Sequence, residues 1–142
     1  MREIWFRGKR IDNSEWIEGY VLKLGKESFS DPERYGIAVR GGIPLIGSGV
    51  CYNLKIDEVD PETVGQYTGL TDKNGKRIFE GDIVKTDKFS EPNKQYIIKY
   101  DLQFGAFIGQ DRYNLYFVTF DGDSGEFEVI GNIHDNPELL EK

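Results

Sequence analysis

Apolar and polar residues alternate along much of this chain. Between Glu15 and Leu24, one set of alternate positions holds Trp16, Glu18, Tyr20, Leu22 and Leu24. Because successive side chains of a β-strand point to opposite faces, this pattern predicts a strand with one face mostly buried. The alternation recurs at residues 96–100 and 127–133, and residues 115–120 are largely apolar on both faces, as in a strand buried on both sides. The sequence therefore predicts a mainly β protein.

Turn-forming residues separate the predicted strands. The pair Asn74-Gly75, within residues 72–76, favours a type I′ turn, since both residues tolerate a positive φ. This pair predicts a hairpin between strands at 67–70 and 77–85. Further turns are predicted between a short strand at 37–39 and strand pieces at 50–52 and 54–56, from the residues Gly41, Gly42, Pro44, Gly47 and Gly49.

Two features predict how the chain is divided and how it ends. Asp60-Pro61-Glu62-Thr63 is a polar cluster around a proline, which favours a connection or one short helical turn. It predicts an N-terminal β unit at 1–60 and a C-terminal β unit at 61–142, two interdependent units that pack as one protein. At the end, Asp135 or Asn136 would cap a short helix over 137–142, opened by Pro137.

Composition narrows the class of protein. The chain has 142 residues, 17 of them glycine, and a formal net charge of −7 at pH 7. An acidic chain is a poor general binder of nucleic acid, because affinity for phosphate comes mainly from Lys and Arg. The single cysteine, Cys51, has no partner for an internal disulfide, which favours a cytoplasmic location. The sequence lacks the run of about 20 apolar residues that spans a bilayer, so no membrane role is expected.

Few residues suggest catalysis. His134 is the single histidine, and Glu80 with Asp82 forms a pair of carboxylates on one face of a predicted strand. These three residues are the one conceivable enzymatic group. Cys51, near Arg40 and Lys55, matches no nucleophile motif and is more typical of a buried small apolar residue. We therefore expect no catalytic residue, no metal site and no cofactor.

An acidic loop resembles part of a calcium site. Asp121, Asp123 and Glu126 are separated by Gly122 and Gly125. An EF-hand loop places its ligands across about twelve residues, whereas this segment is about half that long. A hairpin connection is the favoured interpretation.

Two basic clusters support an alternative function. They consist of Arg7, Lys9 and Arg10, and of Lys73, Lys76 and Arg77. Trp5, Phe6, Tyr67 and Phe79 lie close to them in the sequence, and cations beside stacking rings are typical of single-stranded nucleic-acid binding. Acidic residues interleave with both clusters, so the alternative interpretation is a solvated hairpin tip.

The sequence also contains a faint internal echo. Gly8-Lys9-Arg10-Ile11 recurs as Gly75-Lys76-Arg77-Ile78, and residues 18–23 resemble residues 80–85. One interpretation is a duplicated β unit, and the other is a chance match between turn-and-strand segments in a glycine-rich chain.

Three segments resemble the YopX family of bacteriophage and prophage proteins. The first segment is residues 2–10 followed by Glu15-Trp16-Ile17-Glu18-Gly19. The second is residues 62–84, which include Val64-Gly65-Gln66-Tyr67-Thr68-Gly69-Leu70. The third is residues 129–140, which begin Val129-Ile130-Gly131-Asn132-Ile133-His134-Asp135-Asn136-Pro137. The resemblance implies a largely β fold with an SH3-like barrel in the second half. It also implies the cytoplasm of an infected or lysogenic bacterium, and it supplies no catalytic residues.

The combined expectation is a non-enzymatic accessory protein that binds a host or phage macromolecule. An SH3-like barrel begins a strand with a segment such as Glu80-Gly81-Asp82, where the glycine turns and the aspartate accepts backbone hydrogen bonds. Its groove would be formed by the residues Tyr67, Asn74, Gly75, Lys76, Arg77 and Phe79. The expected partner is a protein, the alternative is nucleic acid, and assembly into a homo-oligomer is compatible with both.

Overall fold

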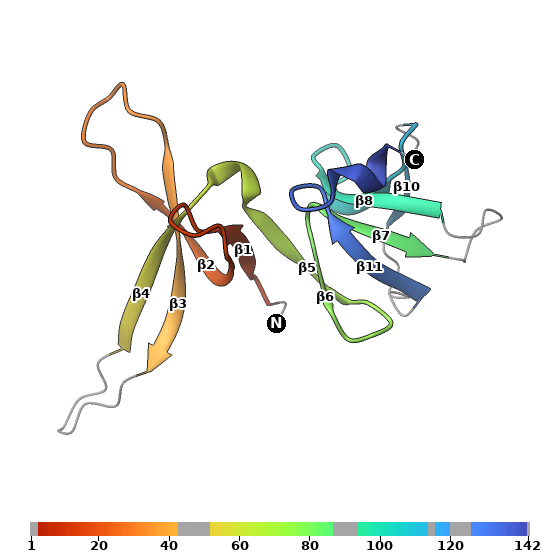
Figure 1. The fold of residues 1–142 in the computed structure, drawn as a ribbon, viewed down its shortest axis with the longest axis horizontal. Helices are drawn as coiled ribbons and strands as arrows, with labels where there is room; N and C mark the ends of the chain where they lie inside the picture. Colours follow the sequence, from red (N-terminus) through yellow and green to blue (C-terminus); the bar gives the residue numbers. More distant parts are fainter. Residues whose placement is uncertain (1–2, 43–51, 87–93, 114–115, 120–125, 142) are drawn as a thin grey trace. The chain divides into compact units, whose positions relative to one another are not determined.

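A computed structural model describes residues 3–42, 52–86, 94–113, 116–119 and 126–141. Antiparallel strands make up most of these residues (Figure 1), which confirms the mainly β prediction. Contacts divide the chain into two compact units, Glu3–Gln66 and Tyr67–Lys142. The division lies a few residues after the Asp60-Pro61-Glu62-Thr63 segment, which itself forms a single 3₁₀ turn, η1 (Pro61–Thr63), with Asp60 as its N-cap.

The N-terminal unit is a meander of four strands followed by a returning fifth. Its elements are β1 (Phe6–Lys9), β2 (Trp16–Leu24), β3 (Arg34–Gly42), β4 (Tyr52–Val59), η1 and the start of β5 (Gly65–Thr71). The strand order is β4-β3-β2-β1-β5, because the first two residues of β5 pair with β1. Beyond β1, Arg10 forms an isolated antiparallel bridge with Val59.

The buried apolar residues of this unit lie on β3 and β4, and Ala38 is 3% exposed. Ile37 and Val59 are 0% and 1% exposed. A Cβ atom at Gly19 would lie 2.2 Å from the carbonyl oxygen of Ala38, so a side chain at this position would push β2 away from β3. The glycine therefore allows the two strands to approach closely.

The C-terminal unit repeats the strand order of the N-terminal unit. Its elements are the rest of β5 with β6 (Arg77–Phe79), then β7 (Asp82–Thr86), β8 (Lys94–Asp101), β9 (Ala106–Gln110), β10 (Tyr116–Thr119), β11 (Phe127–Asn132) and the 3₁₀ turn η3 (Pro137–Leu140). The order β10-β9-β8-β7-β11 again has four consecutive strands and a fifth that pairs with the first. The described residues form an open sheet with β10 and β11 at its edges, so the predicted SH3-like barrel stays a prediction.

The structural repeat does not follow the sequence echo. In the repeat, β7 corresponds to β1, since each is the first strand of its meander and pairs with the fifth. The echo instead matches Gly19, inside β2, with Gly81, in the turn before β7. Gly19 lies within a strand and Gly81 lies in a turn, so the sequence echo does not correspond to the structural repeat.

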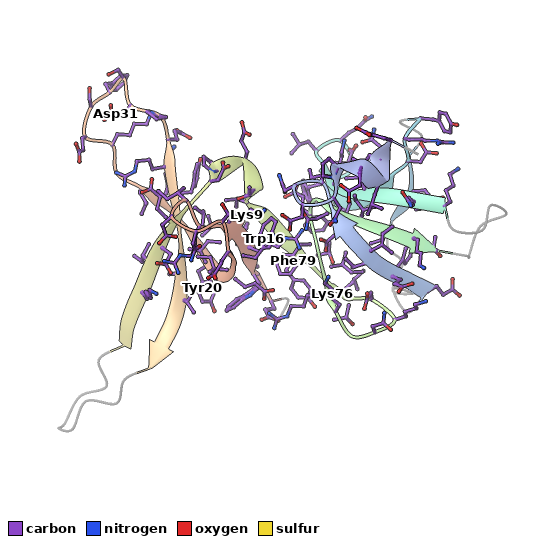
Figure 2. The ribbon with its side chains drawn as sticks, viewed as in Figure 1. Lys9, Trp16, Tyr20, Asp31, Lys76 and Phe79 are labelled. Carbon is purple, nitrogen blue, oxygen red and sulfur yellow. The ribbon has the colours of Figure 1, made fainter. Side chains whose placement is uncertain are left out.

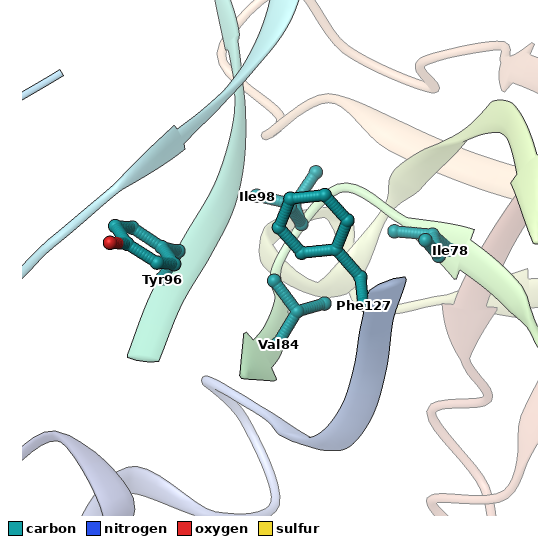
Figure 3. Packing of buried hydrophobic residues seen from close by; sticks show 5 residues of the cluster. All are labelled: Ile78, Val84, Tyr96, Ile98 and Phe127. Carbon is teal, nitrogen blue, oxygen red and sulfur yellow. The ribbon is translucent and has the colours of Figure 1, made fainter. Parts of the chain in front are cut away.

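The hydrophobic core of the C-terminal unit lies between its sheet and the β5–β6 hairpin. Figure 3 shows five of its side chains, which are Ile78, Val84, Tyr96, Ile98 and Phe127. Leu70 and Val129 pack against this cluster. Tyr96 and Ile98 share one face of β8, as their alternation predicted, whereas Tyr100 at the end of that strand is exposed.

Three local predictions need correction. Gly41 and Gly42 continue β3 and pair with Asn53 and Tyr52. The predicted strand 77–85 is interrupted at Glu80-Gly81, because Gly81 takes a φ of +89° and turns the chain. The C-terminal helix is only the 3₁₀ turn η3, and the side chain of Asn136 does not cap it, since its Oδ1 accepts the N–H of Asn132.

The turn between β5 and β6 also differs from the predicted type I′. Gly75 has a φ of +79°, but Asn74 has no positive φ, and type I′ needs both. The N–H of Gly75 donates to the carbonyl of Asp72, and the N–H of Asp72 donates to the carbonyl of Lys76. The carboxylate of Asp72 fixes this longer turn by accepting the N–H groups of Asn74 and Lys76.

Candidate binding surfaces

The β5–β6 hairpin contains all six residues that the sequence predicted as a binding surface. Asn74, Gly75 and Lys76 are exposed at its tip, where Figure 2 labels Lys76. Tyr67 and Phe79 form a cross-strand pair with ring centroids 5.6 Å apart, and both are buried. The guanidinium carbon of Arg77 lies 5.4 Å from the centroid of the Tyr67 ring. The hairpin thus presents a polar tip above two buried rings.

The hairpin is fastened to β11 through Asp72. This aspartate is 5% exposed and accepts the N–H of Val129 at 3.0 Å, while the N–H of Lys73 donates to the carbonyl of Phe127 at 2.9 Å. Burial by itself would raise the pKa of Asp72. Hydrogen bonds from Val129, Lys76 and Asn74, with the charge of Lys76, outweigh burial and hold that pKa below its usual value.

The first basic cluster lies against an aromatic ring and two carboxylates. Lys9 pairs across the strands with Trp16, and its Nζ lies 5.3 Å from a ring centroid of Trp16 (Figure 2). The guanidinium of Arg7 lies over the same ring at 4.7 Å, and Arg7 is buried. Arg10 forms ion pairs with Asp12 at 2.6 Å and with Asp57 at 3.6 Å. These cations have local structural partners.

The second basic cluster is similarly engaged. Lys73 forms an ion pair with Glu128 at 3.2 Å, and Lys85 reaches the same oxygen at 3.0 Å. The two lysines lower the pKa of Glu128, chiefly through hydrogen bonds from Lys85 and then Lys73. Arg77 lies over the ring of Tyr67, and the positive charge of Lys76 helps to lower the pKa of Asp72. Most cations of both clusters thus have partners within this chain.

The three residues of the enzyme hypothesis surround one turn. The carboxylate of Asp82 accepts the N–H of Phe79 at 2.8 Å and is buried, as the turn prediction required of this aspartate. The imidazole of His134 lies beside Gly81, with Nε2 3.9 Å from the position that a Cβ on Gly81 would take. Glu80 is half-buried. Since Asp82 is enclosed in the turn, Glu80 and Asp82 do not form an exposed carboxylate pair.

A hairpin that the sequence did not single out carries exposed apolar residues. It connects β8 to β9, and Leu102 and Phe104 at its tip are 89% and 66% exposed, with Tyr100 beside them at 43%. Asp101 Oδ1 accepts the N–H groups of Gln103 and Phe104 at 2.8 and 2.9 Å. The sequence contains a turn signal here, because Asp101 and Gly105 flank the short segment Leu102-Gln103-Phe104.

The N-terminal unit contains a shallow groove of about 300 Å³. It is lined by Lys9, Arg10, Ile11, Ser14, Asp60 and Pro61. These residues come from the end of β1, the β1–β2 turn and the start of η1. No residue of the enzyme hypothesis lines this groove.

Other sequence candidates have no described site. Cys51 and Asp121 to Gly125 lie outside the described residues, so the cysteine and calcium-loop interpretations stay predictions. Within the described part of the chain, His, Cys, Asp and Glu side chains form no group of three or more that could hold a metal ion. The described residues also include no helix with the length and apolar character needed to cross a bilayer.

These observations define an all-β protein of two units with a common strand order and exposed hairpin tips. The chain belongs to the YopX family, since the family model described as YopX protein matches residues 2–141. This match confirms the resemblance found in the sequence. The chain is also similar to the crystal structure of protein EF1440 from Enterococcus faecalis, with 28% sequence identity, a TM-score of 0.57 and 99% of each chain covered. No curated protein matches it.

Proposed function

We propose that this YopX-family chain is a non-enzymatic accessory protein of a bacteriophage or prophage that binds another protein. It would act in the cytoplasm of the bacterium that carries the phage or prophage. The strand order of the C-terminal unit is compatible with an SH3-like barrel, and we include that barrel in the proposal. The partner is a host or phage protein, and the binding surface is the β8–β9 hairpin tip, defined as Tyr100, Leu102 and Phe104.

The exposure of this tip is the observation that carries the proposal. Transfer of a Leu or Phe side chain out of water is worth about 1.5–3 kcal/mol, and Leu102 and Phe104 gain little of it within this chain. Single exposed apolar residues are ordinary, but two large ones with a tyrosine on one tip form a patch. Such residues serve as anchors at protein interfaces, where few side chains supply most of the binding energy.

Contacts within the chain also position this tip. Tyr100 pairs across the strands with Phe107, and their rings meet edge to face at 5.1 Å. Asp101 holds the tip through its two backbone hydrogen bonds. Because the tip is ordered, binding loses less conformational entropy than it would with a flexible loop.

The surface predicted from the sequence contributes less to this proposal. Tyr67 and Phe79 are buried, so of the predicted residues mainly Asn74, Gly75 and Lys76 remain available at the β5–β6 tip. Nucleic acid is a weaker candidate, because most cations of the two basic clusters already contact rings or carboxylates. Homo-oligomerisation through the apolar tip is a special case in which the partner is a second copy.

Affinity capture with a crosslinker, from lysate of bacteria carrying the phage, tests the proposal. The bait is the full chain, compared with the double variant Leu102→Ser/Phe104→Ser. A control is Phe29→Ser, which removes a fully exposed ring from the other unit. The proposal predicts one protein that is captured by the parent chain and by the control and is lost with the double variant. Capture that is equal with all three baits, or that disappears after nuclease treatment, would contradict it.

A further inference from the structure

The tip of the β5–β6 hairpin (Figure 1) places an amide side chain next to an unhindered backbone nitrogen, in the pair Asn74-Gly75. We propose that Asn74 is a self-modification site, which deamidates through the backbone nitrogen of Gly75 and thereby loosens the turn that fastens the hairpin to β11. The only co-reactant is water, because both reacting groups belong to this chain. The site is separate from the β8–β9 hairpin tip, so the inference goes beyond the proposed function and does not depend on it.

The reaction takes place in two steps. The backbone nitrogen of Gly75 attacks the side-chain carbonyl carbon Cγ of Asn74, so that an N–Cγ bond forms and the bond from Cγ to Nδ2 breaks. The proton of the Gly75 N–H leaves with Nδ2 as ammonia, and a five-membered succinimide ring remains. Water then opens this ring. Hydrolysis of the new N–Cγ bond gives aspartate, and hydrolysis of the original peptide bond gives isoaspartate, in which the main chain runs through the side chain.

Steric access favours Asn74 over the other asparagines. Asn74 is the one asparagine in the sequence that a glycine follows, and glycine has no side chain to obstruct the approach of its nitrogen to Cγ. Both residues are exposed, and a Cβ on Gly75 would meet no atom within 4 Å, so water has access to the reacting groups. Asn13 is also exposed in a turn, but the residue after it is Ser14. Asn13 is therefore the natural comparison.

Hydrogen bonds to Asp72 hold the reacting segment in a closed turn. The N–H of Gly75 donates to the backbone carbonyl of Asp72 at 3.0 Å, and Asp72 Oδ1 accepts the N–H groups of Asn74 and Lys76 at 2.9 Å each. The attacking nitrogen must leave its hydrogen bond before it can bond to Cγ. Because hairpin tips open locally more easily than the whole chain unfolds, the reaction in the folded chain should be slow and limited by opening of this turn.

The products do not fit the original turn. Isoaspartate adds a backbone carbon between positions 74 and 75, and Asp72 Oδ1 accepts N–H groups on both sides of that bond. Both products also add a carboxylate close to the carboxylate of Asp72, and like charges repel. Asp72 Oδ2 accepts the N–H of Val129 on β11, so a turn that no longer positions Asp72 weakens the link between the hairpin and β11.

Peptide mapping by mass spectrometry tests the site on the full chain. One sample is aged for weeks in slightly basic buffer and a second is aged in urea, and chromatography separates aspartate from isoaspartate peptides. The proposal predicts that Asn74 reacts in the folded chain, faster than Asn13, and that it yields isoaspartate as well as aspartate. The rate at Asn74 should be about tenfold lower in buffer than in urea, because the closed turn withholds the nitrogen.

Matched variants separate the gate from its consequence. Asp72→Asn should raise the rate at Asn74 in buffer about three- to tenfold, since it weakens the hydrogen bonds of the turn, whereas Asp101→Asn in the β8–β9 hairpin should leave that rate unchanged. If Asp72→Asn prevents folding, the comparison of buffer with urea still measures the gate. The deamidated fraction of the parent chain should unfold at a lower urea concentration than the unmodified fraction. Ageing of Asn74→Ser should not change its unfolding midpoint.

Several results would overturn the inference. They are an Asn74 that stays intact in buffer while it reacts in urea, equal rates in buffer and in urea, faster reaction at Asn13 than at Asn74, and a deamidated fraction that unfolds at the same urea concentration as the unmodified one. Because these measurements involve no binding partner, their failure leaves the proposed role of the β8–β9 hairpin tip intact.

Discussion

The carboxylate of Asp72 accepts the backbone N–H of Val129, although the two residues are 57 positions apart in the sequence. Its other oxygen accepts the N–H groups of Asn74 and Lys76 in the β5–β6 turn. One buried side chain thus shapes a hairpin turn and fastens that hairpin to β11. Removing it should disturb both local and long-range structure of the C-terminal unit.

Asp72→Asn should lower the free energy of unfolding by about 1–3 kcal/mol, because the amide group cannot accept at both oxygen positions and leaves a buried N–H unsatisfied. Urea denaturation followed by circular dichroism measures the change. The control is Asp101→Asn, whose aspartate accepts its two N–H groups through one oxygen in an exposed turn. If the two variants lose the same stability, the link to Val129 has no special role.

The pKa of Asp72 makes part of the stability depend on pH. Because the folded state lowers this pKa below its usual value of 3.8, the ionised carboxylate stabilises the fold above that value. The contribution is lost as pH falls through the lower pKa of the folded state. Unfolding free energies of the parent and Asp72→Asn should therefore differ most above about pH 4 and converge below it. A difference that stays constant down to pH 2.5 would contradict this assignment.

The sequence predicted the strands and several turns well, because alternation and glycine act locally. It placed the β2 strand correctly, but it continued one strand through residues 77–85, where Gly81 turns the chain. It did not predict the side-chain hydrogen bonds that fix the 72–76 turn, in which Asp72 Oδ1 accepts the N–H groups of Asn74 and Lys76. For this reason Asn74-Gly75 was assigned the wrong turn type.

Burial was harder to predict than the strands. The pattern places Tyr67 and Phe79 in two predicted strands but does not show whether their side chains are covered, so it predicts that these two buried rings line a groove. Leu102 and Phe104 continue the alternation of Tyr96, Ile98 and Tyr100 beyond the end of β8, so the pattern does not distinguish them from buried residues, although their exposure makes them the stronger surface candidates. The common strand order of the two units also has no counterpart in the residues that echo each other.

Gly81→Ala should destabilise the chain by about 1–2 kcal/mol. The φ of +89° at this position is unfavourable for any residue with a Cβ, while the nearest atom to an added Cβ is 3.7 Å away, so the penalty is strain without a clash. Gly25→Ala is the matched control, because a Cβ there meets nothing within 4 Å and φ is not positive. Thermal denaturation of the two variants separates the effects, and equal melting temperatures would count against the strained turn.

Ile98→Ala should cost about 2–5 kcal/mol, because Ile98 is fully buried in the core of the C-terminal unit and its removal leaves a cavity. Leu102→Ala, in the hairpin at the end of the same strand, should change the unfolding free energy by less than about 0.5 kcal/mol. Urea denaturation of both variants provides the comparison. A large loss with Leu102→Ala would mean that this residue stabilises the fold and would weaken its assignment to a binding surface.

Site-specific photo-crosslinking tests the central claim, binding through the β8–β9 hairpin tip, most directly. Benzoylphenylalanine replaces Phe104 in one version of the full chain and Phe29 in another, and both are irradiated inside phage-carrying bacteria. Both positions are exposed, so the two probes meet solvent and crowding proteins alike. The account predicts a discrete protein adduct from position 104 that position 29 does not give. Adducts of equal yield from both positions, or an adduct from position 29 alone, would contradict it.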